Sequence, residues 1–148
     1  MSSTHFSLHY HIVFSTKHRQ PVIVQDWRLR LHAFIGGAVR TLGGVPEIVG
    51  GTADHVHLLI SLRTTHRLAD VMRDVKHSSS QWIHETLNFR NFGWQDGYGV
   101  FTVSPTTINK VKSYIANQEE HHRKRTFREE YLDLLKMSGI EFDESLIE

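Results

Sequence analysis

The sequence predicts an α+β fold: a ferredoxin-like β-α-β-β-α-β antiparallel sheet with helices on one face, followed by further C-terminal helices. Three observations support this prediction. β-branched and aromatic residues gather in four short segments. Two long stretches repeat apolar residues every three or four positions, as amphipathic helices do. The 148 residues, 39% hydrophobic and 22% charged, fit a single domain, which we expect to span 1–148.

Each predicted strand is a short run rich in β-branched and aromatic residues, bounded by turn-forming residues. These runs are Leu8–Thr16, Val45–Val49, Asp54–Leu62 and Val100–Val103. A tight turn at Gly50-Gly51 is predicted between the second and third strands, because paired glycines favour turns.

The apolar repeats place one helix over 26–42, ended by two glycines, and a second helix over 68–87. Ser104-Pro105 predicts the start of a third helix, because serine is a favoured cap and proline is favoured at the first helical position. This helix, which carries Tyr114, is predicted to cover about 105–126. A last helix is expected over 127–137.

The formal net charge of +1 hides a division along the chain. Residues 1–128 carry 16 Lys and Arg against nine Asp and Glu, whereas an acidic segment over about 129–148 carries one lysine against seven acids. A basic body can meet a polyanion, and the acidic end is expected to lie away from that contact. The alternative is a solvated surface whose charges happen to segregate.

The composition excludes several classes of site. With no cysteine, disulfides and thiolate metal sites are excluded, and a reducing cytoplasm is the expected location. No stretch approaches the roughly 20 apolar residues that span a bilayer, so no membrane partner is expected. The first residues lack the basic start and apolar run of a signal peptide.

Two short motifs carry groups that can act in one chemical site. On a strand, His55 and His57 project together, because residues two apart share a face. On a helix, Tyr114 and Gln118 lie one turn apart on a common face. Two imidazoles, an amide oxygen and a phenol can form a metal site with a nucleophile beside it. Such a site suits the breaking and rejoining of a phosphodiester.

The residues alone leave alternatives open. With twelve histidines a His-x-His pair can arise by chance, and His9 and His11 form a second pair on the first strand. The buried-looking apolar run that follows His57 favours the pair formed with His55, since a rigid central strand suits a metal platform. A helical tyrosine such as Tyr114 commonly rests its ring on the core with its hydroxyl in water.

Four segments in a fixed order resemble a known family. They are Tyr10–Arg19, Asp54–Ile60, Gly97–Ser104 and Tyr114–His122. Together they resemble the single-tyrosine HUH transposases, and more narrowly the small enzymes of the insertion-sequence 200/605 group. HUH denotes two histidines that flank a bulky hydrophobic residue, matched here by His55-Val56-His57. The likeness covers nearly the whole chain.

The resemblance implies a mechanism and a set of partners. Tyr114 would be the nucleophile that forms a 5′-phosphotyrosine, and His55, His57 and Gln118 would bind one divalent metal, Mg²⁺ or Mn²⁺. The substrate would be single-stranded DNA with hairpin ends, and no organic cofactor would be needed. The family also works as homodimers with composite active sites, in which the tyrosine helix of one subunit completes the histidine pair of the other.

Two parts of that mechanism are less defined by the sequence. The proton acceptor for the nucleophile is not evident, and His121 or His122 are candidates because they follow Tyr114 by about two helical turns. Affinity for DNA must come from basic side chains near phosphates. For each such residue, the alternative is a solvated surface charge that makes no contact with DNA. The candidate DNA contacts are Lys17, Arg19, Lys76, Lys110, Lys112, Arg123 and Arg125.

Two other functions compete with this interpretation. The first is a non-catalytic ferredoxin-like nucleic-acid-binding module, such as a domesticated transposase. The paired aromatic stacking motif of the usual RNA-binding sheet is not evident, which disfavours it. The second is a two-histidine phosphoesterase, which would need repeated His-x-Ser/Thr elements, whereas His57 is followed by Leu58.

Overall fold

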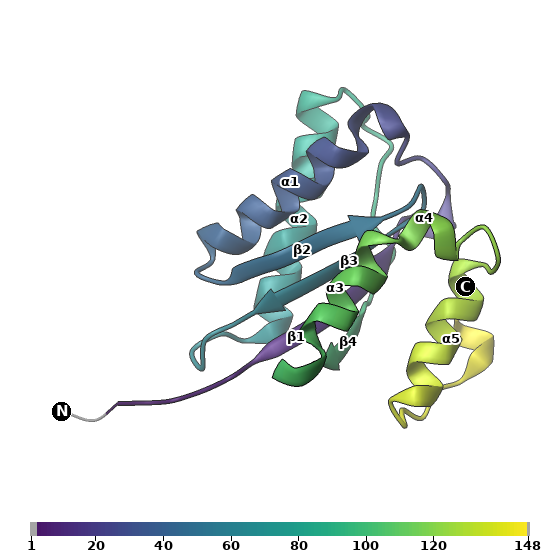
Figure 1. Cartoon of the computed structure of the whole chain (residues 1–148). Coiled ribbons are helices and arrows are strands. Elements are labelled where there is room, and N and C mark those ends of the chain that lie inside the picture. Colours follow the sequence, from purple (N-terminus) through teal and green to yellow (C-terminus); the bar gives the residue numbers. More distant parts are fainter. Residues whose placement is uncertain (1–2, 148) are drawn as a thin grey trace.

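The computed structural model describes residues 3–147 and confirms the predicted fold class (Figure 1). Four strands form one antiparallel sheet in the order β2-β3-β1-β4, which is the ferredoxin-like arrangement. The strands are β1 (His9–Ser15), β2 (Val45–Gly51), β3 (His55–Ser61) and β4 (Gly99–Thr102). The α-helices are α1 (Gln25–Thr41), α2 (Leu68–Thr86), α3 (Ile108–Ala116), α4 (Gln118–His121) and α5 (Phe127–Met137).

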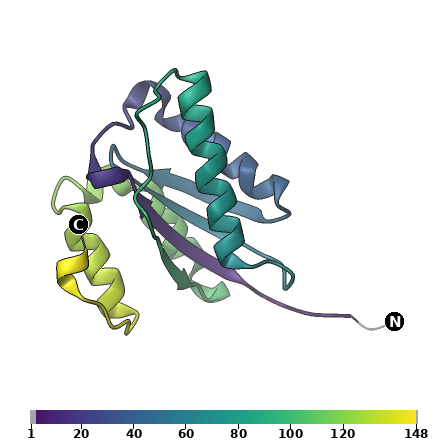
Figure 2. The same cartoon turned by 180° about the vertical axis from the view of Figure 1, so that it is seen from behind.

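The main core lies between the sheet and the pair α1 and α2, which cover one face of it (Figure 2). Because strand side chains alternate, Val56, Leu58 and Ile60 of β3 enter this core. They meet apolar residues of both helices, such as Leu31 and Met72, and all five side chains are fully buried. This core fixes β3 as a rigid central strand.

The other residues of β3 point to the opposite face, which α3 crosses (Figure 1). α5 adds apolar side chains at the side of this face. Leu59 packs against Ile115 of α3, and Val13 of β1 packs against Phe127 of α5. Burying an aliphatic side chain of this size contributes about 1.5–3 kcal/mol, so these contacts hold both C-terminal helices against the sheet. His55 and His57 therefore lie in a second buried region, between the sheet and the C-terminal helices, and are not exposed to solvent.

The turn between β2 and β3 lies later than predicted. Gly50 and Gly51 belong to β2 and pair with His57 and Val56, and the chain reverses over 52–54. A glycine is needed at position 50 because the chain packs closely there, and not because the chain turns. A Cβ at Gly50 would lie 2.6 Å from the carbonyl oxygen of Ile115, so a glycine lets α3 approach the sheet beside the histidine pair.

The single helix predicted over about 105–126 is also wrong in its extent. A short 3₁₀ turn precedes α3, and α3 ends at Ala116. Asn117 has a φ of −103° and a ψ of 26°, outside the helical region, and α4 then begins at Gln118. Asparagine favours such breaks because its side chain competes for backbone hydrogen bonds. The chain then turns back, so that α5 returns toward Tyr114.

Among residues 3–147, no helix combines the length and the apolar character needed to cross a membrane.

Candidate active site

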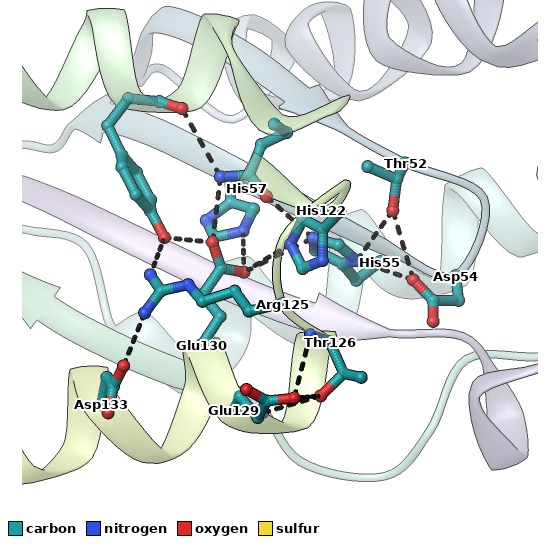
Figure 3. Close-up of polar contacts among 12 residues, drawn as sticks. Thr52, Asp54, His55, His57, His122, Arg125, Thr126, Glu129, Glu130 and Asp133 are labelled. Atoms are coloured by element: carbon teal, nitrogen blue, oxygen red, sulfur yellow. Dashed lines mark hydrogen bonds and ion pairs between the residues drawn. The ribbon is translucent and has the colours of Figure 1, made fainter. Parts of the chain in front are cut away.

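His55 is held by groups on both sides of its ring. Its Nδ1 lies 2.7 Å from Oδ1 of Asp54 and 3.1 Å from the hydroxyl of Thr52 (Figure 3). The ring stacks on Phe127 of α5 with centroids 4.3 Å apart. Since a carboxylate only accepts, Nδ1 carries the proton and Nε2 offers a lone pair to the interior. Nε2 lies 2.9 Å from the side-chain oxygen of Gln118.

His57 is oriented by a residue of the neighbouring strand. Its Nδ1 lies 2.7 Å from Nε2 of His11 in β1, and the two rings stack with centroids 5.0 Å apart. Burial lowers the pKa of His57 to about 4, although Glu130 opposes this shift. Burial likewise lowers the pKa of His11 to about 3. Both imidazoles are therefore neutral near pH 7, which is the form that binds metals.

A fully buried carboxylate, Glu130 of α5, lies at the centre of the cluster (Figure 3). Its Oε1 lies 3.0 Å from Nε2 of His57, 3.1 Å from Nε2 of His122 and 3.6 Å from Nε2 of His55. Burial alone would raise the pKa of Glu130. Hydrogen bonds from His122 and His57 outweigh burial and hold the pKa of this carboxyl well below its usual value. Glu130 is therefore an anion inside the protein.

Tyr114 and Gln118 reach the same carboxylate from α3 and α4. The Tyr114 hydroxyl and Nε2 of Gln118 both donate to Oε2 of Glu130, the latter over 3.1 Å. Burial and the negative charge of Glu130 raise the pKa of Tyr114 above its ordinary value, while Arg125 opposes this shift. The phenol is therefore protonated at neutral pH and has a carboxylate in position to receive its proton.

The donor atoms fit a divalent cation. The Gln118 amide nitrogen donates to Glu130, so its oxygen turns a lone pair toward the lone pair of His55 Nε2 at 2.9 Å. Two lone pairs at this distance repel unless a proton or a metal ion lies between them. Adjacent ligands held about 2.1 Å from an octahedral ion lie about 3.0 Å apart, close to the spacing seen here. His55, His122 and Glu130 also form a group whose ligand atoms all lie within 4.8 Å of one another.

The structure brings together the four residues singled out in the sequence, Tyr114, His55, His57 and Gln118, within one chain. The alternative pair, His9 and His11, does not form a separate site, because His11 hydrogen-bonds to His57.

Sequence reasoning missed the central role of Glu130. The acidic segment of the chain was expected to lie away from the basic working surface, but α5 delivers one of its acids into the site. The usable indication was weak: Glu130 follows a Thr126–Glu129 capping box, which predicts a helix start and says nothing of which side chain turns inward. His11 was noted only as a rival ligand, and His122 only as a candidate proton acceptor.

The candidate DNA contacts divide into different environments. Lys17 and Lys110 are exposed, whereas Lys112 pairs with Glu47 at 3.5 Å and Arg123 with Glu120 at 3.4 Å. Lys76 donates to the carbonyl oxygens of Gln95 and Gly97, so it holds the loop before β4.

An open hollow of about 660 Å³ lies beside the site. Its lining includes Arg19 and Arg125, together with Asp54 and His122 from the buried cluster. Arg125 also contacts Tyr114 directly, with Nη2 3.3 Å from the hydroxyl. The hollow therefore brings basic residues together with Asp54, His122 and Arg125, each of which contacts a residue of the buried cluster.

Comparison with known proteins identifies the family of the chain. Two curated relatives are transposases. The ISDra2 transposase TnpA of Deinococcus radiodurans is 27% identical over 121 residues, covering 78% of this chain and 86% of the relative. The transposase for insertion sequence element IS200 of Salmonella typhimurium is 26% identical over 133 residues, covering 83% and 84%.

Two solved structures share the fold. A candidate transposase from Deinococcus radiodurans R1 superimposes with a TM-score of 0.63 at 23% identity, covering 80% of this chain and 96% of the other. A REP-associated tyrosine transposase bound to a REP hairpin gives a TM-score of 0.60 at 13% identity, covering 82% and 74%. Residues 4–118 match the sequence profile of the family described as Transposase IS200 like, and the chain belongs to this family of transposases.

Proposed function

We propose that this transposase cuts and rejoins single-stranded DNA by transesterification, with Tyr114 as the nucleophile. The observation that carries the proposal is the convergence of the Tyr114 hydroxyl, the Gln118 amide and the imidazoles of His55 and His57 around one buried carboxylate. A phenol beside a group of metal ligands is the arrangement that this chemistry needs.

His55, His57 and Gln118 would hold one divalent ion through Nε2, Nε2 and Oε1. Asp54 orients His55 and His11 orients His57, as second partners do for metal-bound histidines. Amide and carboxylate oxygens suit Mg²⁺, and the imidazoles also suit Mn²⁺. When bound, the ion neutralises charge that develops on the phosphate.

In the cutting step, Oη of Tyr114 bonds to phosphorus and the bond from phosphorus to the 3′ oxygen breaks. The phenol proton moves toward Oε2 of Glu130, which already accepts its hydrogen bond, and passes from there to solvent. The departing 3′ oxygen takes up a proton from water, so the step consumes and releases no net proton. The products are a 5′-phosphotyrosine and a free 3′ hydroxyl. Because the new ester keeps the energy of the old one, a second 3′ hydroxyl can reverse the step and join DNA without ATP.

Hairpin-marked DNA ends are the proposed substrate. One structural relative was solved bound to a REP hairpin, which supports this class of ligand. A second copy of the chain is the proposed partner, by resemblance to the family. The four groups already meet within one chain, so exchange of α3 between subunits is not needed to assemble them. Light scattering on the purified protein, with and without hairpin DNA, measures the subunit number.

The proposal is tested with a 3′-labelled hairpin oligonucleotide incubated with protein and Mg²⁺ or Mn²⁺. The expected result is a nick with the labelled downstream fragment attached to the protein on a denaturing gel. Tyr114→Phe should abolish the adduct, and His55→Ala with His57→Ala should prevent both events. If Tyr114→Phe forms the same adduct, the assignment of the nucleophile is wrong. Binding without any nick would favour the non-catalytic module.

A further inference from the structure

Arg125 lies between the nucleophile and a second acid. Its Nη2 is 3.3 Å from the hydroxyl of Tyr114, and its Nη1 is 2.5 Å from Oδ2 of Asp133 in α5 (Figure 3). The side chain is 33% exposed, so one side of the guanidinium touches the buried cluster and the other meets solvent. This position differs from that of an ordinary surface charge.

Asp133 fixes the direction of the guanidinium. An exposed pair between an arginine and a carboxylate adds little to stability, so this contact alone explains little. Its effect here is geometric, because a planar fork held at one end presents its other N–H groups in fixed directions. Within residues 3–147, Asp133 and Tyr114 engage two of the five N–H groups of Arg125.

The open hollow beside the site gives a strand access to this guanidinium. Arg125 lines the hollow with Arg19, Arg123 and Lys124, and the half-buried His122 is also part of its lining. Its volume of about 660 Å³ lies within the range of sites that bind organic ligands. Arg125 is therefore a basic group that faces the hollow and also lies 3.3 Å from the Tyr114 hydroxyl.

We propose that Arg125 is a catalytic residue whose guanidinium binds a non-bridging oxygen of the scissile phosphate while Tyr114 attacks. The inference rests on the proposed function. It adds Arg125, a residue to which the proposed function assigns no role. As the bond from Oη to phosphorus forms and the bond to the 3′ oxygen breaks, negative charge increases on the non-bridging oxygens. A preoriented cation at that point stabilises the transition state more than the ground state.

The same contact serves the reverse step. The phosphotyrosine ester keeps two non-bridging oxygens beside the Tyr114 position, where the guanidinium lies. Lysine carries the charge but lacks the fork, so it cannot hold Asp133 and a phosphate oxygen together. Arg125→Lys should therefore retain part of the activity and Arg125→Gln should retain less.

The test is single-turnover adduct formation with Mn²⁺ on hairpin DNA. Arg125→Gln should lower the rate about 10²–10³-fold, the cost of removing one preoriented donor. The matched control is Arg128→Gln, three residues on, whose guanidinium pairs with Glu144 and not with the site. This control should stay within about fivefold of the parent, as an exposed pair predicts. Thermal melting of each variant shows whether it is folded.

Sulfur substitution at the scissile phosphate separates direct contact from a structural role. The parent and Arg125→Lys are compared on the ordinary phosphate and on each of the two phosphorothioate diastereomers. If Arg125 contacts one oxygen, the rate loss in Arg125→Lys shrinks about tenfold on one diastereomer only. Equal losses on all three substrates, or a normal rate in Arg125→Gln, would overturn the proposal. Adduct formation by the parent tests the proposed function separately.

Discussion

Oε1 of Glu130 lies 3.0 Å from Nε2 of His57, with both side chains fully excluded from solvent. An anion and a neutral imidazole with no water between them form a site that favours a cation. The same carboxylate places its other oxygen at the Tyr114 hydroxyl. One acid of α5 therefore links the metal-binding residues to the nucleophile.

Glu130→Gln should lower the affinity for Mn²⁺ by about tenfold or more. Within residues 3–147, Glu130 is the only carboxylate in contact with His57, and it also contacts His55 and His122. The substitution removes this negative charge from the site. Titration calorimetry on the folded variant measures this directly. Glu129→Gln is the control, since Glu129 is exposed and glutamine can also complete its capping box. Equal Mn²⁺ affinity in Glu130→Gln and the parent would show that Glu130 does not contribute to the site.

Much of the fold could be predicted because it rests on local patterns. The alternation of β3 and the helical repeats of α1 and α2 are visible in the sequence, and Phe127–Met137 was predicted at its observed bounds. The turn was placed at Gly50-Gly51 because the true role of Gly50 is a tertiary one, the close approach of α3 to the sheet. The break at Asn117 is local, but a single asparagine inside a continuing helical pattern is a weak signal.

The site was predictable where two residues lie close together in the sequence. His55 and His57 are two apart on one strand. Tyr114 and Gln118 are four apart and were expected on one helix, but they lie on either side of the break at Asn117 and still meet at Glu130. Glu130 joins them through a reversal of the chain between α4 and α5, which no periodic pattern encodes. The contact of His11 with His57 depends on the register of β1 against β3, which is likewise a tertiary property.

His11→Phe should lower metal affinity by about 10–100-fold without removing a proposed ligand. A metal at Nε2 of His57 would require the proton on Nδ1, and Nε2 of His11, 2.7 Å away, would then accept it. Phenylalanine keeps the ring but offers no acceptor. Mn²⁺ titration followed by electron paramagnetic resonance measures the change. His9→Ala on the same strand should bind Mn²⁺ as the parent does, and a loss in His9→Ala alone would point to the rival pair.

Gly50→Ala should destabilise the protein by about 1–3 kcal/mol and lower cutting activity, because overpacking displaces α3. The added Cβ would lie 2.6 Å from the carbonyl oxygen of Ile115, next to Tyr114. Urea unfolding gives the free energy. Gly37→Ala is the matched control: its Cβ meets nothing within 4 Å, and alanine in a helix is favoured by about 1 kcal/mol over glycine. Equal stability of the two variants would contradict the packing argument.

Stability should fall as pH drops below about 6.5. Burial lowers the pKa of His32 to about 4 from 6.5. Between these values the unfolded chain binds a proton that the folded protein excludes, so acid favours unfolding. This one group should cost about 1–2 kcal/mol on moving from pH 7 to pH 5. His32→Gln should therefore show a smaller loss than the parent in urea unfolding at the two pH values. An identical loss would show that His32 does not titrate in this range.

The most direct measurement of the central claim is the identity of the residue that carries DNA after cutting. Trypsin should release Tyr114 in the peptide 113–123, where it is the only tyrosine. After nuclease trimming of the covalent complex, mass spectrometry should find a nucleotide 5′-phosphate on Tyr114 of that peptide. A nucleotide on another residue, such as Tyr10 or His121, or a nick formed with no covalent complex at any time point, would contradict the account.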